Sequence, residues 1–137
     1  MKANAIKRVL LSHLPGMAYR CLYDDNWTME FVSKGCQVLT GYPAESLLYN
    51  RDLSFNDIIC SEYREILRKE WEKAVALKKS FRYEYEIITA KGERKWVLEL
   101  GQAVYNEKDE VEALEGLIFD INNQKLRELQ IQYMNEN

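Results

Sequence analysis

The chain of 137 residues holds one histidine, His13, and that residue lies close to the N-terminus. Histidine is the side chain most often used as a general base and as a metal ligand. The motifs G-x-S-x-G and H-E-x-x-H and a glycine-rich phosphate loop are also lacking, and the six glycines are scattered. We therefore expect a non-catalytic segment without a metal site.

Cysteine is scarce as well. Cys21, Cys36 and Cys60 form an odd set, widely spaced and without a C-x-x-C pair. A zinc or redox site would need further ligands nearby, and the chain has a single histidine. The pattern favours reduced, buried thiols in a reducing compartment.

Long apolar runs are lacking too. No stretch approaches the ~20 residues that a membrane-spanning helix needs. The unbroken apolar stretch Val9-Leu10-Leu11 is much shorter than a signal-peptide core of roughly 7–15 residues. These absences predict a cytoplasmic segment, either free or beneath the membrane span of a longer parent. The net charge of −3 argues against a nucleic-acid partner, which needs a clustered basic surface.

The composition present is that of one soluble globular domain, with 47% apolar and 30% charged residues. Apolar residues at helical spacing, Ile6 and Val9 among them, predict a helix near the N-terminus. We expect 1–14 to be an N-terminal flanking helix, 15–122 the central domain, and 123–137 a C-terminal linker that forms a coiled-coil helix.

The hydrophobic pattern of the central domain predicts the α+β class, with strand hairpins at both ends and helices grouped between them. A long helix is expected at 61–79, preceded by several short helical turns between 33 and 59. The expected strands are 17–23, 27–32, 81–87, 94–105 and 111–121.

Several short motifs follow one another in a fixed order along residues 14–125. They are LPGMAYRC at 14–21, WTMEFVSKGC at 27–36, LTGYP at 39–43, FNDII at 55–59, YEIITAKGE at 85–93, KWV at 95–97 and LEGLIFDIN at 114–122. No single motif is specific. The ordered set resembles a PAS domain of the bacterial sensory type.

The resemblance implies a five-stranded antiparallel sheet curved around a small cavity, with short helices and one long helix on one face and a flanking helix at each end. It also implies a sensory role upstream of an effector in the same chain, such as a histidine kinase or a diguanylate cyclase. The family's closing Asp-Ile-Thr, which passes signals into a connecting helix, corresponds here to Asp120-Ile121-Asn122. Asn122 keeps a short polar side chain able to cap that helix.

Aromatic residues are abundant, with nine tyrosines and three tryptophans. Tyrosine and tryptophan suit pockets that are apolar at one end and need a hydrogen bond at the other. They would equally fill the core of a ligand-free dimerisation or scaffold module, so both hypotheses stay open. The side chains that we expect to line a cavity for a small-molecule ligand are Tyr19, Phe31, Tyr42, Tyr83, Tyr85, Trp96 and Leu98.

Two cofactors known in the family are disfavoured. Haem-binding members use an axial ligand that is commonly a histidine, and no histidine occurs in residues 14–137. Flavin photosensors use an Asn-Cys-Arg-Phe-Leu type motif, and its nearest counterpart, YNRDLSF at 49–55, lacks the cysteine. The identity of any other cofactor stays open.

The two ends of the chain predict a homodimer. The tail has apolar residues at three- and four-residue spacing, which outlines a coiled-coil seam. The N-terminal helix needs an apolar surface, and we expect the outer face of the sheet to offer one through Val97, Leu117 and Phe119. Because the seam stops in mid-pattern, we expect an effector domain after Asn137. The tail residues concerned are Leu126, Leu129 and Tyr133.

Overall fold

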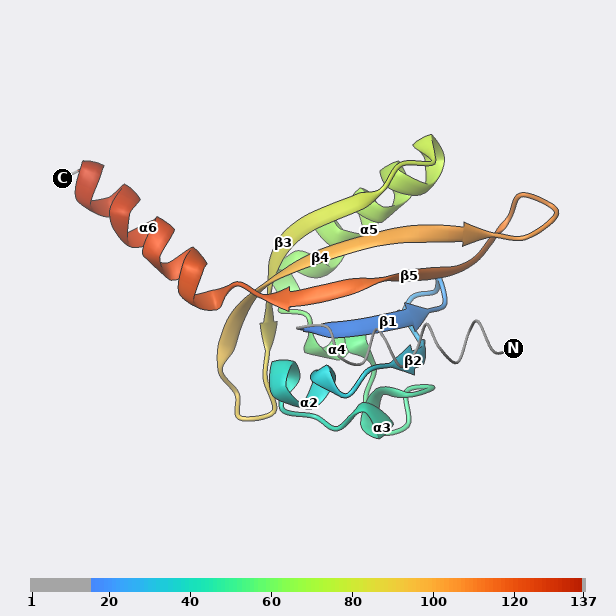
Figure 1. The fold of residues 1–137 in the computed structure, drawn as a ribbon, viewed down its shortest axis with the longest axis horizontal. Coiled ribbons are helices and arrows are strands. Elements are labelled where there is room, and N and C mark those ends of the chain that lie inside the picture. The colour runs from blue at the N-terminus through green and yellow to red at the C-terminus, as the bar shows by residue number, and fades with distance from the viewer. Residues whose placement is uncertain (1–15, 137) are drawn as a thin grey trace.

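The computed structural model describes residues 16–136, and its centre is one antiparallel sheet of five strands (Figure 1). The order across the sheet is β2-β1-β5-β4-β3, so the last strand of the chain lies between β1 and β4. The five-stranded antiparallel sheet implied by the PAS resemblance is confirmed. The strands are β1 (Met17–Cys21), β2 (Met29–Val32), β3 (Phe81–Ile88), β4 (Arg94–Tyr105) and β5 (Val111–Asp120).

Four helices connect β2 to β3 and cover one face of the sheet (Figure 1). We call this the inner face; Tyr19, Tyr85 and Ile118 are among the buried side chains that point from it. The opposite, outer face carries Arg20, which pairs with Glu115 in the β1–β5 register, and Leu117, which pairs with Ala18. The helices are α2 (Gly35–Thr40), α3 (Ala44–Leu47), α4 (Phe55–Ile58) and α5 (Ser61–Leu77).

Helix α5 packs an apolar stripe against the inner face. Leu67 and Trp71 are each 1% exposed, and the Trp71 ring stacks on Phe81 of β3 with 4.1 Å between centroids and 2° between planes. Burying a large apolar side chain contributes roughly 1.5–3 kcal/mol. This stripe therefore fixes α5 on the sheet.

Two glycines in mid-strand let these side chains approach the sheet closely. Gly101 of β4 lies opposite Gly116 of β5. A Cβ atom at Gly101 would lie 2.7 Å from Tyr19 Oη and 2.9 Å from the Trp71 ring. A glycine inside a strand often marks such a close approach, and here it makes room for Tyr19 and Trp71.

Strand β4 turns inward the opposite set of side chains from the one that we expected. Val97 and Glu99 are 0% and 5% exposed on the inner face. Trp96 and Leu98 lie on the outer face, and the register places Val97 beside the buried Tyr85. A shift of one residue moves every side chain of a strand to the other face. Our expectations of Val97 outside and of Trp96 and Leu98 inside were therefore wrong.

Helix α6 (Asn122–Glu136) leaves the end of β5 and extends away from the sheet (Figure 1). None of its described side chains is buried, and Leu126 and Leu129 are 51% and 42% exposed. The helix expected over 1–14 lies outside the described residues. Across 16–136, none of the helices has the length and apolar character that a membrane crossing requires.

Candidate functional site

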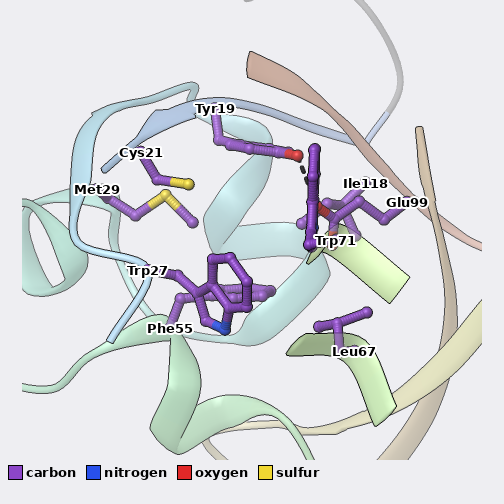
Figure 2. Close-up of a pocket in the computed structure, with 9 residues that line it drawn as sticks. All are labelled: Tyr19, Cys21, Trp27, Met29, Phe55, Leu67, Trp71, Glu99 and Ile118. Carbon is purple, nitrogen blue, oxygen red and sulfur yellow. Dashed lines mark hydrogen bonds between the residues drawn. The ribbon is translucent and has the colours of Figure 1, made fainter. Parts of the chain in front are cut away.

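A small cavity lies between the inner face of the sheet and helices α4 and α5 (Figure 2). Its volume is about 10 Å³, roughly the space of one water molecule. Figure 2 shows aromatic rings around much of it and the sulfur atoms of Cys21 and Met29 on one side. The surrounding residues are Tyr19, Cys21, Trp27, Met29, Phe55, Leu67, Trp71, Glu99 and Ile118.

Glu99 of β4 contributes a buried carboxylate to this cavity. Tyr19 Oη of β1 donates a hydrogen bond to Glu99 Oε2 at 2.5 Å, and Tyr85 Oη of β3 donates to Oε1 at 2.6 Å. O–H···O⁻ bonds of this length are characteristic of an ionised acceptor. Within residues 16–136, no lysine or arginine pairs with this carboxylate, so its hydrogen-bond partners are neutral donors.

The protonation states follow from this environment. Burial raises the pKa of Glu99, while hydrogen bonds from Tyr19, Tyr85 and the Trp71 indole oppose the rise. Burial, together with the Glu99 carboxylate, raises the pKa of Tyr19 and of Tyr85 well above its usual value, so both phenols stay protonated and can donate. Three donors suit an ionised carboxylate, because its oxygens only accept.

Four of the seven side chains that we expected at the cavity lie on the side of the sheet that faces it, either at the cavity wall or in the surrounding core. Tyr19 lines the cavity, and Tyr85 binds the glutamate that lines it. Tyr83 is half-buried on the inner face beside Phe81, outside the cavity wall. Tyr42 follows α2 and packs at the margin of the core, also away from the wall.

The other three expected side chains lie on the outer face, which corrects our expectation. Phe31 is paired with Arg20, whose side chain forms ion pairs with outer-face glutamates. Trp96 and Leu98 lie on the outer face because the two faces of β4 are the reverse of those that we expected. In each case a neighbouring residue occupies the inward position.

Most of the residues that line this cavity, above all Glu99, are not among those that the sequence led us to expect. A glutamate in an alternating strand normally points to solvent, so its charge alone gives no indication of burial. The mid-strand glycine two positions later, Gly101, was the available indication, because it lies on the same face as Glu99 and admits Tyr19 and Trp71. The other missed wall residues are Cys21, Trp27, Met29, Phe55, Leu67, Trp71 and Ile118.

The size of the cavity limits what it can hold with its walls in these positions. Pockets for drug-sized ligands enclose ~300–1,000 Å³, far more than the about 10 Å³ here. A haem or a flavin would need the tryptophan side chains to move. All three cysteines are buried, and no cluster within residues 16–136 gathers three side chains of the types that bind metals.

The junction between β5 and α6 is held by side chains of the Asp-Ile-Asn segment. Asp120 Oδ1 accepts a hydrogen bond from the Asn122 backbone N–H at 2.9 Å. Asn122 Oδ1 accepts from the Trp96 backbone N–H at 3.0 Å, and the Ile121 N–H donates to the Trp96 carbonyl at 3.1 Å. Asn122 thus ties the start of α6 to β4, whereas we expected its side chain to cap the helix.

Trp96 connects this junction to α5. The Tyr63 ring of α5 meets the Trp96 ring edge-on, with 6.1 Å between centroids and 74° between planes. On α6, Lys125 Nζ lies 5.0 Å from the centroid of the Trp96 ring and forms an ion pair with Glu84 at 2.9 Å. The indole therefore lies between the long helix and the outgoing helix.

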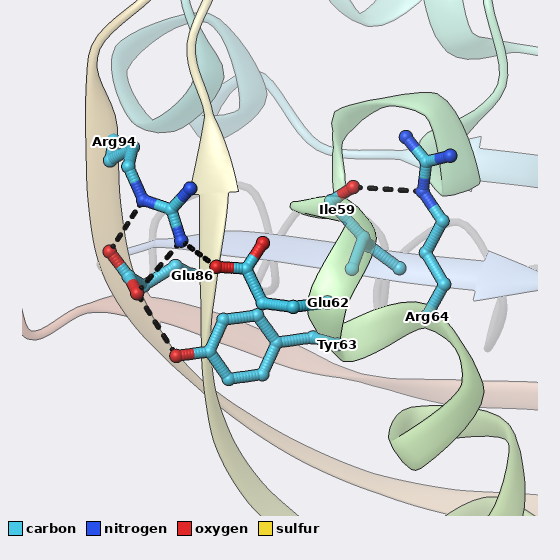
Figure 3. Close-up of polar contacts among 6 residues, drawn as sticks. All are labelled: Ile59, Glu62, Tyr63, Arg64, Glu86 and Arg94. Carbon is cyan, nitrogen blue, oxygen red and sulfur yellow. Dashed lines mark hydrogen bonds and ion pairs between the residues drawn. The ribbon is translucent and has the colours of Figure 1, made fainter.

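A polar network holds Tyr63 in this position (Figure 3). Tyr63 Oη donates to Glu86 Oε1 at 3.0 Å, and Arg94 Nε donates to Glu86 Oε2 at 3.0 Å. Arg94 also pairs with Glu62 of α5. Burial and the bond to Glu86 raise the pKa of Tyr63 to about 12. The first turn of α5 is thereby tied to β3 and β4.

Comparisons with known proteins agree with this architecture. The family model described as the PAS fold matches residues 29–118. A methyl sulfide methyltransferase-associated sensor from Methanosarcina acetivorans is 29% identical over 124 residues, which cover 89% of this chain. The match covers 12% of that curated relative, so this chain spans a small part of its length.

Two solved structures share the fold at low sequence identity. A sensory box histidine kinase/response regulator from Burkholderia thailandensis superposes with a TM-score of 0.72 at 18% identity, covering 97% of this chain and 95% of that one. The N-terminal domain of a diguanylate cyclase with a PAS/PAC sensor from Marinobacter aquaeolei gives 0.67 at 20% identity, covering 80% and 98%. With the family model spanning two-thirds of the sequence and the five-stranded sheet in place, the chain belongs to the PAS family.

Proposed function

We propose that this PAS domain is the input module of a longer signalling protein. In this proposal it senses a small molecule at the Glu99 cavity and passes the change through α6 to an effector in the same chain, such as a histidine kinase or a diguanylate cyclase. The description of the Methanosarcina relative as a sensor and the names of the two structural neighbours support a signalling role. The module itself is proposed to be non-catalytic and cytoplasmic.

One observation carries the proposal: the cavity wall and the contact with the output junction lie on one stripe of α5. Tyr63, Leu67 and Trp71 are spaced four residues apart, which places them on the same helix face. Leu67 and Trp71 line the cavity, while Tyr63 touches Trp96. Lys125 of α6 lies over the same Trp96 ring. A displacement of α5 at the cavity would therefore reach the base of α6.

The relay would act as a shift between two packings, with no chemical step. A ligand that fits one position of α5 better than another changes the populations of the two. Because α6 is held at its base by Asn122 and Lys125, its direction would follow that choice. Asp120 and Ile121 complete the proposed relay, because their hydrogen bonds fix the turn between β5 and α6.

The proposed assembly is a homodimer formed through the flanking helices and the outer sheet face. Exposed apolar side chains on α6, including Leu126, Leu129 and Met134, suit contact with a second copy. Half-buried Leu117 and Phe119 continue the apolar surface on the outer face. If two copies of α6 pack together, a change in the direction of each helix would change the contact between them.

The small volume of the cavity favours a second candidate, a scaffold module that never binds a ligand. A centre with room for about one water molecule is close to a filled core. The buried Glu99 carboxylate argues for the sensor, because an uncompensated charge weakens a core that only has to pack. Ligand binding at this cavity separates the two candidates.

The relay can be tested by NMR spectroscopy on the ¹⁵N-labelled chain. Leu67→Ala enlarges the cavity, and we expect it to shift the backbone amide signals of residues 122–126. The shift should be much smaller in a Trp96→Leu background, because the intervening ring is gone. Ile66→Ala, at a neighbouring position that is 43% exposed, is the control. An α6 response to Leu67→Ala that is the same with and without Trp96 would contradict the relay.

A further inference from the structure

The cavity combines a buried carboxylate with walls that supply no positive charge. Glu99 receives hydrogen bonds from Tyr19, Tyr85 and the Trp71 indole. The other lining side chains are apolar or carry sulfur, apart from the buried indole N–H of Trp27, which has no hydrogen-bond partner among the described residues. Arg68 does not pair with Glu99. Its guanidinium stacks on Trp27 at 3.7 Å, and its Nη2 donates to the Asp24 carbonyl at 2.7 Å. A buried carboxylate without a cation is unfavourable, and a cationic ligand would remove that cost.

The walls select among cations. Trp27, Phe55 and Trp71 surround the space with aromatic rings (Figure 2), and an organic ammonium group is attracted to such ring faces. A hard metal ion such as Mg²⁺ or Ca²⁺ needs about six or more oxygen ligands, whereas the carboxylate of Glu99 and the phenol of Tyr19 are the oxygen groups among the lining side chains.

We propose that the Glu99 cavity binds a small protonated amine, of the size of ammonium or methylammonium. Its N–H groups would donate to Glu99, and its alkyl part would lie against the aromatic rings and the sulfur atoms. This inference rests on the proposed sensory function and names the ligand class of the same site. An alkylamine, like the lysine side chain, carries its proton at neutral pH.

The size of the space sets the order of affinity. Ammonium is close to a water molecule in size, and the cavity of about 10 Å³ holds one such particle. Methylammonium needs room for one more carbon atom. Met29 can provide it, because methionine is unbranched and repacks readily. A tetramethylated cation would have to displace the ring of Trp27 or Trp71, so we expect it to bind much more weakly.

Calorimetric titration of the wild-type chain with ammonium chloride and methylammonium chloride tests the proposal. Potassium chloride at the same ionic strength controls for charge alone, and methanol is the neutral counterpart of methylammonium. We expect saturable binding of the two amines and no comparable heat with potassium or methanol. No saturable binding of either amine, or equal binding of potassium or methanol, would overturn the proposal.

Two variants locate the binding. Glu99→Gln removes the charge and keeps an acceptor, and it should weaken amine binding by about tenfold or more. Glu112→Gln, at an exposed position on β5, should leave the affinity unchanged. If Glu99→Gln does not fold, the wild-type chain still gives the answer, because amine affinity should rise with pH as Glu99 loses its proton. Affinity that is independent of both Glu99 and pH would overturn the assignment.

The experiments distinguish a wrong relay from a wrong ligand class. Amine binding without any change in the α6 signals would uphold this inference and contradict the relay. An α6 response to Leu67→Ala in a chain that binds no amine would uphold the relay and overturn the amine as its ligand.

Discussion

Glu99 places a negatively charged carboxylate in the core of the molecule. Its carboxylate is 5% exposed and is held by the phenols of Tyr19 and Tyr85, with a further hydrogen bond from the Trp71 indole. These donors satisfy the oxygen atoms but leave the charge itself without a counter-ion. A group in this position makes the stability of the protein depend on pH and on any cation that reaches it.

The variant Glu99→Gln should become more stable relative to wild type as pH rises. Burial raises the pKa of Glu99 in the folded protein, so the folded form binds its proton more tightly than the unfolded form. That contribution is present at low pH and is lost as pH rises through the folded pKa. Because glutamine does not titrate, the difference in the free energy of unfolding between the variant and wild type should grow steadily as pH rises through the folded pKa.

Urea unfolding of both proteins across a pH series measures this difference. The groups that face Glu99 do not interfere, because the pKa values of Tyr19, Tyr85 and Cys21 are raised well above their usual values and Trp71 does not ionise. Glu107→Gln, at an exposed position between β4 and β5, serves as the control. A difference that stays constant with pH would mean that folding does not perturb the proton on Glu99.

At the scale of elements, β4 shows how far the sequence alone can lead. The alternation of its residues predicts a strand, and the structure confirms that strand. The more apolar of its two sets of alternating side chains, which includes Trp96 and Leu98, nevertheless lies on the outer face. The inner position of Glu99 depends on Tyr19, which is 80 residues away along the chain. Trp96 is half-buried outside because Tyr63 and Lys125 cover it. Neither contact is visible in local periodicity.

The ordered motifs were sufficient to predict the family and the sheet, because they record turns and strand ends, which are local. They could not predict the cavity wall, because four of its aromatic side chains come from β1, the β1–β2 connection, α4 and α5. The residues concerned are Tyr19, Trp27, Phe55 and Trp71.

The start of α6 should depend on Asn122. Asn122→Ala removes the acceptor of the Trp96 backbone N–H, a bond of 3.0 Å, and should cost about 1 kcal/mol locally. We expect the Lys125 amide, which donates to the Ile121 carbonyl at 2.8 Å, to exchange its hydrogen about fivefold faster.

The neighbouring substitution Asn123→Ala is the matched control, because Asn123 is exposed and has the same chemistry. Hydrogen exchange followed by NMR reads both variants. Equal exchange rates for the Lys125 amide in the two would show that the Asn122 side chain does not hold α6.

At the scale of the whole molecule, the fold places the cavity and the junction with α6 at two ends of one stripe of α5. The cavity lies against Leu67 and Trp71, and the base of α6 is reached through Tyr63 and Trp96. The polar network of Glu62, Glu86 and Arg94 holds the same end of α5 (Figure 3). None of the described side chains of α6 is buried, so within this chain the direction of α6 depends on the contacts at its base.

The proposed dimer predicts that Leu129 is an interface residue. Leu129→Glu places a charge in the apolar seam of α6, where the wild-type side chain is 42% exposed in the single chain. We expect the dissociation constant of the dimer to rise by about tenfold or more. Sedimentation velocity measures this, with Gln130→Glu as a control of equal charge at an exposed neighbour. A wild-type chain that stays monomeric at high concentration would refute the dimer.

The central claim is that occupancy of the Glu99 cavity changes the base of α6. The most direct test is a titration of the ¹⁵N-labelled chain with methylammonium, following the Trp71 indole signal and the backbone amides of residues 122–126 together. The account predicts that both sets move along one saturation curve and that Glu99→Gln abolishes both movements. A Trp71 signal that saturates while the α6 amides stay in place would contradict it.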